Sequence, residues 1–121
     1  MDKKTLLLFD DDKQLLEMAT LVLESFGYNV AVSYTSHDVI EKVSEIKPDL
    51  ILMDNWIPTI GGIEATRLLK NHAKYNCIPV IYLSANKDIE SLANQAGADT
   101  YLEKPFNLVD LENLINKFLS V

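Results

Sequence analysis

Four groups of polar side chains stand at or next to the ends of apolar runs. In chain order they are Asp10-Asp11-Asp12 after Leu6–Phe9, Asp54 after Leu50–Met53, Ser84 after Val80–Leu83, and Lys104 just after Tyr101-Leu102. If these runs are parallel strands of one sheet, the four groups meet at its carboxyl edge, where open α/β sheets bind ligands. Carboxylates, a hydroxyl and an ammonium around one aspartate predict that Asp54 accepts a phosphoryl group beside a divalent cation.

Asp10 and Asp11 are adjacent carboxylates that repel each other unless a cation is near. A hard divalent ion with oxygen ligands, Mg²⁺ above all, relieves that repulsion. A solvated acidic turn, with Asp12 capping the following helix, explains the same residues without a metal. This segment alone leaves both interpretations open.

The other three groups also have a chemical and a structural interpretation. An ionised Asp54 is a nucleophile toward phosphorus, and the Ser84 hydroxyl can donate a hydrogen bond to a phosphoryl oxygen. The Lys104 ammonium suits either a phosphoryl oxygen or the acidic cluster. Taken singly, the three would be a loop aspartate, a capping serine and a surface lysine. Pro105 favours the chemical interpretation of Lys104, because a proline restricts the turn that places the lysine.

Composition and charge narrow the function classes. The chain has 121 residues, 48% of them apolar, which suits one domain with a sizeable core. A formal net charge of −7 argues against binding nucleic acid through a broad basic surface and against an anionic membrane surface. Cys77 is the single cysteine, and no apolar run is long enough for a signal peptide or a membrane span. We therefore expect a soluble, cytoplasmic protein.

Five apolar runs alternate with five helical patterns. The expected strands are Leu6–Phe9, Val30–Val32, Leu50–Met53, Val80–Leu83 and Thr100–Leu102. The first helix has an apolar stripe at helical spacing, closed by Gly27, and consists of Leu15, Ala19, Val22 and Phe26. Continuous apolar strands are typical of a parallel sheet that helices cover on both faces. The pattern predicts an α/β fold, a doubly wound five-stranded parallel sheet with five helices, in a single domain.

Taken together and in order, these motifs resemble the receiver domain of response regulators in two-component signalling, the family that includes the chemotaxis response regulator. The matching segments are Leu7–Asp12, Leu52–Pro58, Val80–Ala85, Gly97–Asp99 and Tyr101–Phe106. The resemblance covers essentially the whole chain. It implies a flavodoxin-like, three-layer α/β/α fold, with residues 1–121 forming one receiver domain.

The resemblance implies a role for each matching position around the metal. Asp54 would accept a phosphoryl group from a phosphohistidine on a partner and, with Asp11, supply carboxylate oxygens to Mg²⁺. Asp10 would act on the ion largely through water, and the backbone carbonyl of Trp56 would be a further ligand. The chain would then be a phosphoprotein that gains and loses its phosphoryl group as a switch, without being a turnover enzyme.

Three further positions would hold the phosphoryl group or report it. Ser84 and Lys104 would bind phosphoryl oxygens, and Tyr101 would move inward as the Ser84 hydroxyl shifts toward the phosphate. A sensor histidine kinase or a histidine phosphotransfer protein would be the phosphoryl donor. The helix at 88–96, the strand at 101–103 and the last helix would face an output domain or a twin subunit. Direct binding of nucleic acid by this domain, or of a membrane, is not expected.

The chain departs from the family pattern in the loop after Asp54. Gly61 stands where the family often has an acidic or small polar residue, and the resulting Gly61-Gly62 pair should loosen the loop. Trp56 is a large side chain two residues beyond the phosphoacceptor, and Asn86 lies two beyond Ser84. Both flank the path of an attacking water, so we hypothesise that Trp56 slows hydrolysis of the aspartyl-phosphate.

Two other functions compete with the phosphorylated switch. A phosphatase of the haloacid dehalogenase type would use Asp10 and Asp12, but it needs a later acidic motif, where only Asp110 and Glu112 follow inside an amphipathic helix. It would also leave Asp54 without a role. A phosphorylation-independent interaction module is disfavoured because the acidic pair, Asp54, the serine and the lysine are all intact.

Overall fold

The computed structural model describes residues 3–119, which form a single five-stranded parallel sheet with five helices. In chain order the elements are β1 (Thr5–Phe9), α1 (Lys13–Ser25), β2 (Asn29–Ser33), α2 (Val39–Ile46), β3 (Leu50–Asp54), α3 (Gly61–Lys70), β4 (Val80–Ser84), α4 (Ile89–Ala96), β5 (Thr100–Glu103) and α5 (Leu108–Leu119). The strands are ordered β2-β1-β3-β4-β5, so the direction of winding reverses between β1 and β3. The predicted doubly wound sheet is confirmed.

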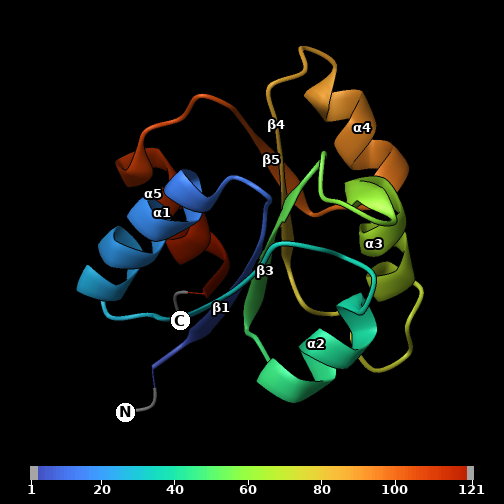
Figure 1. Cartoon of the computed structure of the whole chain (residues 1–121), viewed down its shortest axis with the longest axis horizontal. Coiled ribbons are helices and arrows are strands. Elements are labelled where there is room, and N and C mark those ends of the chain that lie inside the picture. Colours follow the sequence, from blue (N-terminus) through green and yellow to red (C-terminus); the bar gives the residue numbers. More distant parts are fainter. Residues whose placement is uncertain (1–2, 120–121) are drawn as a thin grey trace.

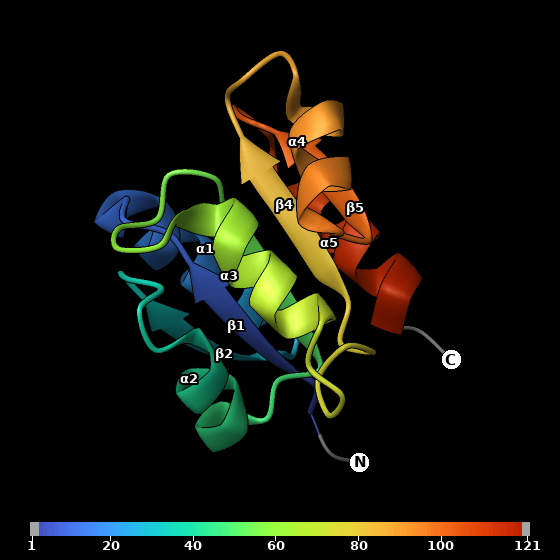
Figure 2. The same cartoon turned by 90° about the vertical axis from the view of Figure 1, so that its right-hand side faces the viewer.

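Helices cover both faces of the sheet, because successive side chains of a strand point to opposite sides. Leu6 and Leu8 of β1 pack in one core with α1 and α5, whereas Leu7 and Phe9 pack in a second core with α2, α3 and α4. Figure 1 shows these two layers on either side of the strands, and Figure 2 shows α2, α3 and α4 across the near face. Among residues 3–119, none of the helices combines the length and the apolar character needed to cross a membrane.

Helix α1 begins as predicted, but the stripe that it buries shares only Ala19 with the predicted one. Oδ1 of Asp12 accepts a hydrogen bond of 3.1 Å from the Leu15 N–H and so caps the first turn. The residues that α1 buries against the sheet are Leu16, Ala19 and Leu23. Phe26 lies beyond the end of the helix and is 49% exposed. The helix carries apolar residues on adjacent stripes, and packing on the sheet selects the one that starts at Leu16.

The two glycines after β3 have separate steric roles. Gly61 has a φ of +78°, a conformation that side chains disfavour. Gly62 is buried inside α3, and a Cβ at this position would lie under 3.0 Å from the carbonyl oxygen of Asp54. The first turn of α3 therefore packs directly on the backbone at the end of β3. Both glycines lie in the first turn of α3, whereas we expected the pair to belong to the loop before the helix.

Candidate functional site

Three carboxylates gather at the carboxyl edge of the sheet. β1 and β3 pair in parallel with Phe9 opposite Met53, so the residues that follow them lie side by side. Asp10, Asp11 and Asp54 each place one carboxylate oxygen within 4.8 Å of the others. Asp10 and Asp54 are buried, with 2% and 4% of their surface exposed, whereas Asp11 is exposed. Burial of two close carboxylates is costly unless positive charge compensates them.

Lys104 supplies part of that compensation. Its Nζ lies 2.8 Å from Oδ2 of Asp10 and 2.7 Å from Oδ1 of Asp54. Its backbone N–H donates a 2.8 Å hydrogen bond to the Ser84 carbonyl, which ties the loop after β5 to the end of β4. Three carboxylates and one ammonium leave two formal negative charges, and oxygen donors with that charge suit a divalent ion such as Mg²⁺.

Burial and charge together raise the pKa of both central groups, which favours the charged form of Lys104 and disfavours that of Asp54. Burial raises the pKa of Asp54, and the negative charge of Asp10 adds to the rise, while Lys104 and the Trp56 N–H act against it. Burial by itself would lower the pKa of Lys104, but the hydrogen bonds and charges of Asp10 and Asp54 outweigh burial and raise it. Lys104 therefore stays charged at neutral pH.

The remaining predicted site residues lie at different distances from the cluster. The Trp56 N–H donates a 2.9 Å hydrogen bond to Oδ2 of Asp54, while the residue itself is 80% exposed. Ser84 is buried at the end of β4, and its Oγ accepts a 3.0 Å hydrogen bond from the Asn86 N–H. Tyr101 is outside the cluster: it is 37% exposed, and its hydroxyl donates a 2.9 Å hydrogen bond to Oε2 of Glu90 on α4.

Comparison with known proteins identifies the family of this fold and site. The family model "Response regulator receiver domain" matches residues 6–116. The chain belongs to this family. The resemblance inferred from the motifs is confirmed, and so is the flavodoxin-like α/β/α fold that it implied.

Relatives of this receiver domain include longer proteins. The chain is 34% identical over 111 residues to "DNA-binding response regulator MtrA" of Mycolicibacterium paratuberculosis, a match that covers 90% of this chain and 48% of the relative. The chain thus spans about half the length of these curated relatives.

Solved structures resemble the receiver along its whole length. A response regulator from Chloroflexus aurantiacus has a TM-score of 0.91 and 30% identity, with 99% of this chain and 100% of that one covered. The receiver domain of a sensor histidine kinase from Pseudomonas aeruginosa PAO1 has a TM-score of 0.89 and 26% identity, with the same coverage. That structure has a magnesium ion coordinated in its active-site cleft.

Two residues of this receiver that the sequence analysis overlooked meet beside Asp54. The hydroxyl of Tyr82 donates a hydrogen bond to Oδ1 of Asn55, the residue that follows Asp54. Tyr82 has no exposed surface, and burial, with the nearby charge of Asp54, raises its pKa to about 12. A tyrosine in the otherwise aliphatic run of β4 was the available signal, but its partner depends on how β3 and β4 pair.

A third overlooked residue, Ser36, anchors the loop between β3 and α3. It is fully buried, its Oγ donates a 3.0 Å hydrogen bond to the Pro58 carbonyl, and the same Oγ accepts one of 3.3 Å from the Ile60 N–H. Thr59, between those two residues, has a φ of +91°, which is unfavourable for a β-branched side chain. The β2–α2 loop thus holds a strained part of the β3–α3 loop in place.

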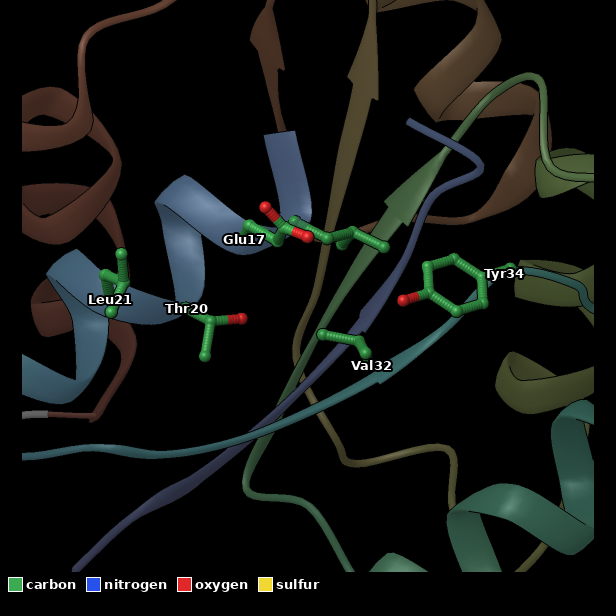
Figure 3. A pocket seen from close by; sticks show the side chains of 6 residues that line it. Glu17, Thr20, Leu21, Val32 and Tyr34 are labelled. Carbon is green, nitrogen blue, oxygen red and sulfur yellow. The ribbon is translucent and has the colours of Figure 1, made fainter. Parts of the chain in front are cut away.

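A separate apolar groove of about 350 Å³ lies between α1 and β2 (Figure 3). Its lining consists of Leu16, Glu17, Thr20, Leu21, Val32 and Tyr34. None of these residues belongs to the acidic cluster, and Glu17 is the only carboxylate among them. The groove is therefore distinct from the polar site of the receiver.

Proposed function

We propose that Asp54 takes a phosphoryl group from a phosphohistidine on a partner, with Mg²⁺ as cofactor, and that phosphorylation switches the protein–protein contacts of this receiver. One observation carries the proposal. The buried Asp54 carboxylate lies 2.7 Å from the Lys104 ammonium and shares a 4.8 Å cluster with Asp10 and Asp11. A nucleophile, a cation to hold phosphoryl oxygens and a metal-binding donor set are therefore in one place.

These groups can carry out the proposed phosphoryl transfer in one step. An oxygen of Asp54 forms a bond to phosphorus while the P–N bond to the donor histidine breaks, and the leaving nitrogen keeps the electron pair and takes up a proton. Mg²⁺, when bound, supplies positive charge that offsets the repulsion between phosphoryl and carboxylate oxygens. The residues that would hold it are Asp10, Asp11, Asp54 and, through its backbone carbonyl, Trp56.

The phosphoryl oxygens would be bound by Lys104 and Ser84. Lys104 carries its positive charge at neutral pH and already reaches Oδ1 of Asp54. Because the Oγ of Ser84 accepts its hydrogen bond from the Asn86 N–H, its own hydrogen stays available to a phosphoryl oxygen. Tyr101, which now faces outward to Glu90, would move inward as the Ser84 hydroxyl engages the phosphate.

We propose a sensor histidine kinase or a histidine phosphotransfer protein as the phosphoryl donor. We also propose that residues 1–121 form a single receiver domain. Asn94 and Glu103 are exposed on the α4–β5–α5 face, which we propose as the surface for an output domain or a twin subunit. The DNA-binding function in the name of MtrA belongs to a protein about twice as long, and we propose none for this domain. A cytoplasmic location stays a prediction.

The competing functions have less support. Asp12, which a dehalogenase-type phosphatase would use, caps α1 through its side chain. The family match is to receivers, and we propose a switch that is phosphorylated and dephosphorylated rather than a turnover enzyme. An interaction module without phosphorylation would not require the buried, charge-compensated Asp54.

Acetyl phosphate with Mg²⁺ tests the proposal. Mass spectrometry of the intact protein and of its peptides should find one added phosphoryl group on Asp54, and chelation of the metal should abolish it. Asp54→Asn should remove the label, whereas Asp110→Asn, at an exposed aspartate of α5, should keep it. Label on another residue would overturn the site assignment, and no label with Mg²⁺ present would favour the phosphorylation-independent module.

A further inference from the structure

A buried tyrosine touches the residue next to the phosphoacceptor. Tyr82 lies on β4, directly opposite Met53 of β3, and its hydroxyl reaches the side-chain oxygen of Asn55. With a pKa raised to about 12, this hydroxyl is protonated at neutral pH and is the donor of the bond. Tyr82 packs in the apolar core that α2, α3 and α4 cover, which holds its ring in place.

Asn55 is held from three directions. Besides the bond from Tyr82, its N–H donates a 2.9 Å hydrogen bond to the Leu83 carbonyl of β4, and its carbonyl accepts one of 3.2 Å from the Gly62 N–H of α3. Two of these contacts are backbone bonds that most residues at position 55 can make. The Tyr82 bond is the one contact of the three that depends on the particular side chains of this chain.

The orientation of Asn55 determines where the next backbone N–H lies relative to the Asp54 carboxylate. The peptide bond after Asn55 carries the Trp56 N–H, which donates a 2.9 Å hydrogen bond to Oδ2 of Asp54. The other oxygen, Oδ1, is the one that Lys104 reaches at 2.7 Å. A rotation of Asn55 would turn the Trp56 N–H away, and Oδ2 of Asp54 would lose this donor while Oδ1 kept Lys104.

We propose that Tyr82 is a positioning residue for the phosphoacceptor: its hydroxyl holds Asn55, and Asn55 holds the Trp56 N–H on the Asp54 carboxylate. This inference rests on the proposed function and adds a residue to it. The hydroxyl of Tyr82 donates to Asn55 and not to a carboxylate of the acidic cluster. It acts through the backbone between Asn55 and Trp56, by keeping Asp54 in the orientation that the transfer requires.

Removal of one hydroxyl tests this role. Tyr82→Phe should slow labelling of Asp54 by acetyl phosphate at saturating Mg²⁺. We expect a factor of about three to ten, which corresponds to the free energy of one hydrogen bond. Mg²⁺ affinity, followed by the fluorescence of Trp56, the single tryptophan, should weaken in the same variant. Asn55→Ala should have a similar effect. Because both changes break the same bond, the double variant should be no slower than the slower single variant.

A matched control separates positioning from general loss of stability. Tyr75→Phe removes a hydroxyl from the same core, in the loop before β4 at the amino edge of the sheet, and should label at the wild-type rate. Equal labelling by Tyr82→Phe and wild type would overturn the inference, as would additive effects in the double variant or slowing by Tyr75→Phe to the same degree. If wild type itself takes no label, the proposed function fails and the inference fails with it.

Discussion

Lys104 holds Asp54 by an ion pair of 2.7 Å between Nζ and Oδ1. Asp54 ends β3 and Lys104 follows β5, so the pair bridges the whole width of β4, which lies between those strands. Lys104 also donates its backbone N–H to the carboxyl end of β4. A change of charge on Asp54 would therefore affect Lys104, and through it both the end of β4 and the segment that follows β5.

Lys104→Met should destabilise the protein in the absence of metal. It leaves the buried carboxylates of Asp10 and Asp54 facing each other without their ammonium, and we expect a loss of about 1–3 kcal/mol in the free energy of unfolding. Added Mg²⁺ should restore part of that loss, because it replaces the missing charge.

Urea unfolding with chelator and with Mg²⁺ measures both effects. Lys42→Met, at a half-buried lysine on α2, is the control and should show neither. Unchanged stability of Lys104→Met under both conditions would mean that the ion pair does not compensate the buried carboxylates.

Tyr82 should make the fold sensitive to alkali. A tyrosine is neutral when protonated, and with a pKa of about 12 in the fold against about 10 in the unfolded chain, the folded state holds the proton more tightly. The stability that Tyr82 contributes is complete below about pH 10 and is lost as the pH rises toward about 12. Tyr82→Phe lacks this group, so its unfolding free energy should fall less between about pH 9 and about pH 11 than that of wild type. Parallel losses in the two proteins would contradict the prediction.

Trp56→Ala should shorten the lifetime of the phosphorylated protein. The indole is 80% exposed next to a buried carboxylate, so it is free to cover the phosphoryl group from the solvent side. We expect hydrolysis to speed up about fivefold, which is ~1 kcal/mol in the barrier. Loss of label after removal of acetyl phosphate measures the rate. Tyr34→Ala, at another exposed aromatic residue, should leave it unchanged, and equal lifetimes of Trp56→Ala and wild type would refute the shielding hypothesis.

Ser36→Ala should release the loop between β3 and α3. The change removes the hydroxyl that donates to the Pro58 carbonyl and accepts from the Ile60 N–H. The Pro58 carbonyl keeps the Ser36 backbone N–H, but the Ile60 N–H loses this acceptor in a partly buried position. We expect a loss of about 1–3 kcal/mol in unfolding free energy. Urea unfolding measures it, and Ser44→Ala, at an exposed serine of α2, provides the baseline. A variant as stable as that baseline would show that the loop does not depend on Ser36.

The sequence predicted what depends on local pattern and failed where tertiary packing decides. Continuous apolar runs marked the strands, and the polar residues at their ends marked the carboxyl edge where Asp10, Asp54 and Lys104 meet. The stripe of α1 was predicted as Leu15, Ala19, Val22 and Phe26, whereas packing on the sheet buries Leu16, Ala19 and Leu23. Neighbouring apolar stripes on one helix are equivalent until a partner surface selects one of them.

The contacts that hold Asp54 could not be predicted for a similar reason. The bond between Tyr82 and Asn55 exists only because β3 and β4 pair in one particular register. The bonds of Ser36 require the β2–α2 and β3–α3 loops to meet, although 22 residues separate Ser36 from Pro58. A tyrosine in an aliphatic run can be noticed in the sequence, but the partner that it contacts cannot be read from it.

The contact between Gly62 and the Asp54 carbonyl leaves no room for a side chain between β3 and α3. A shift of the Asp54 backbone therefore cannot be absorbed by a change of rotamer, because rigid main chain meets rigid main chain. The first turn of α3 has to follow the strand. If Asp54 is phosphorylated as proposed, a displacement of its backbone would pass through this contact to the helical layer formed by α2, α3 and α4, and would not require Tyr101 to move.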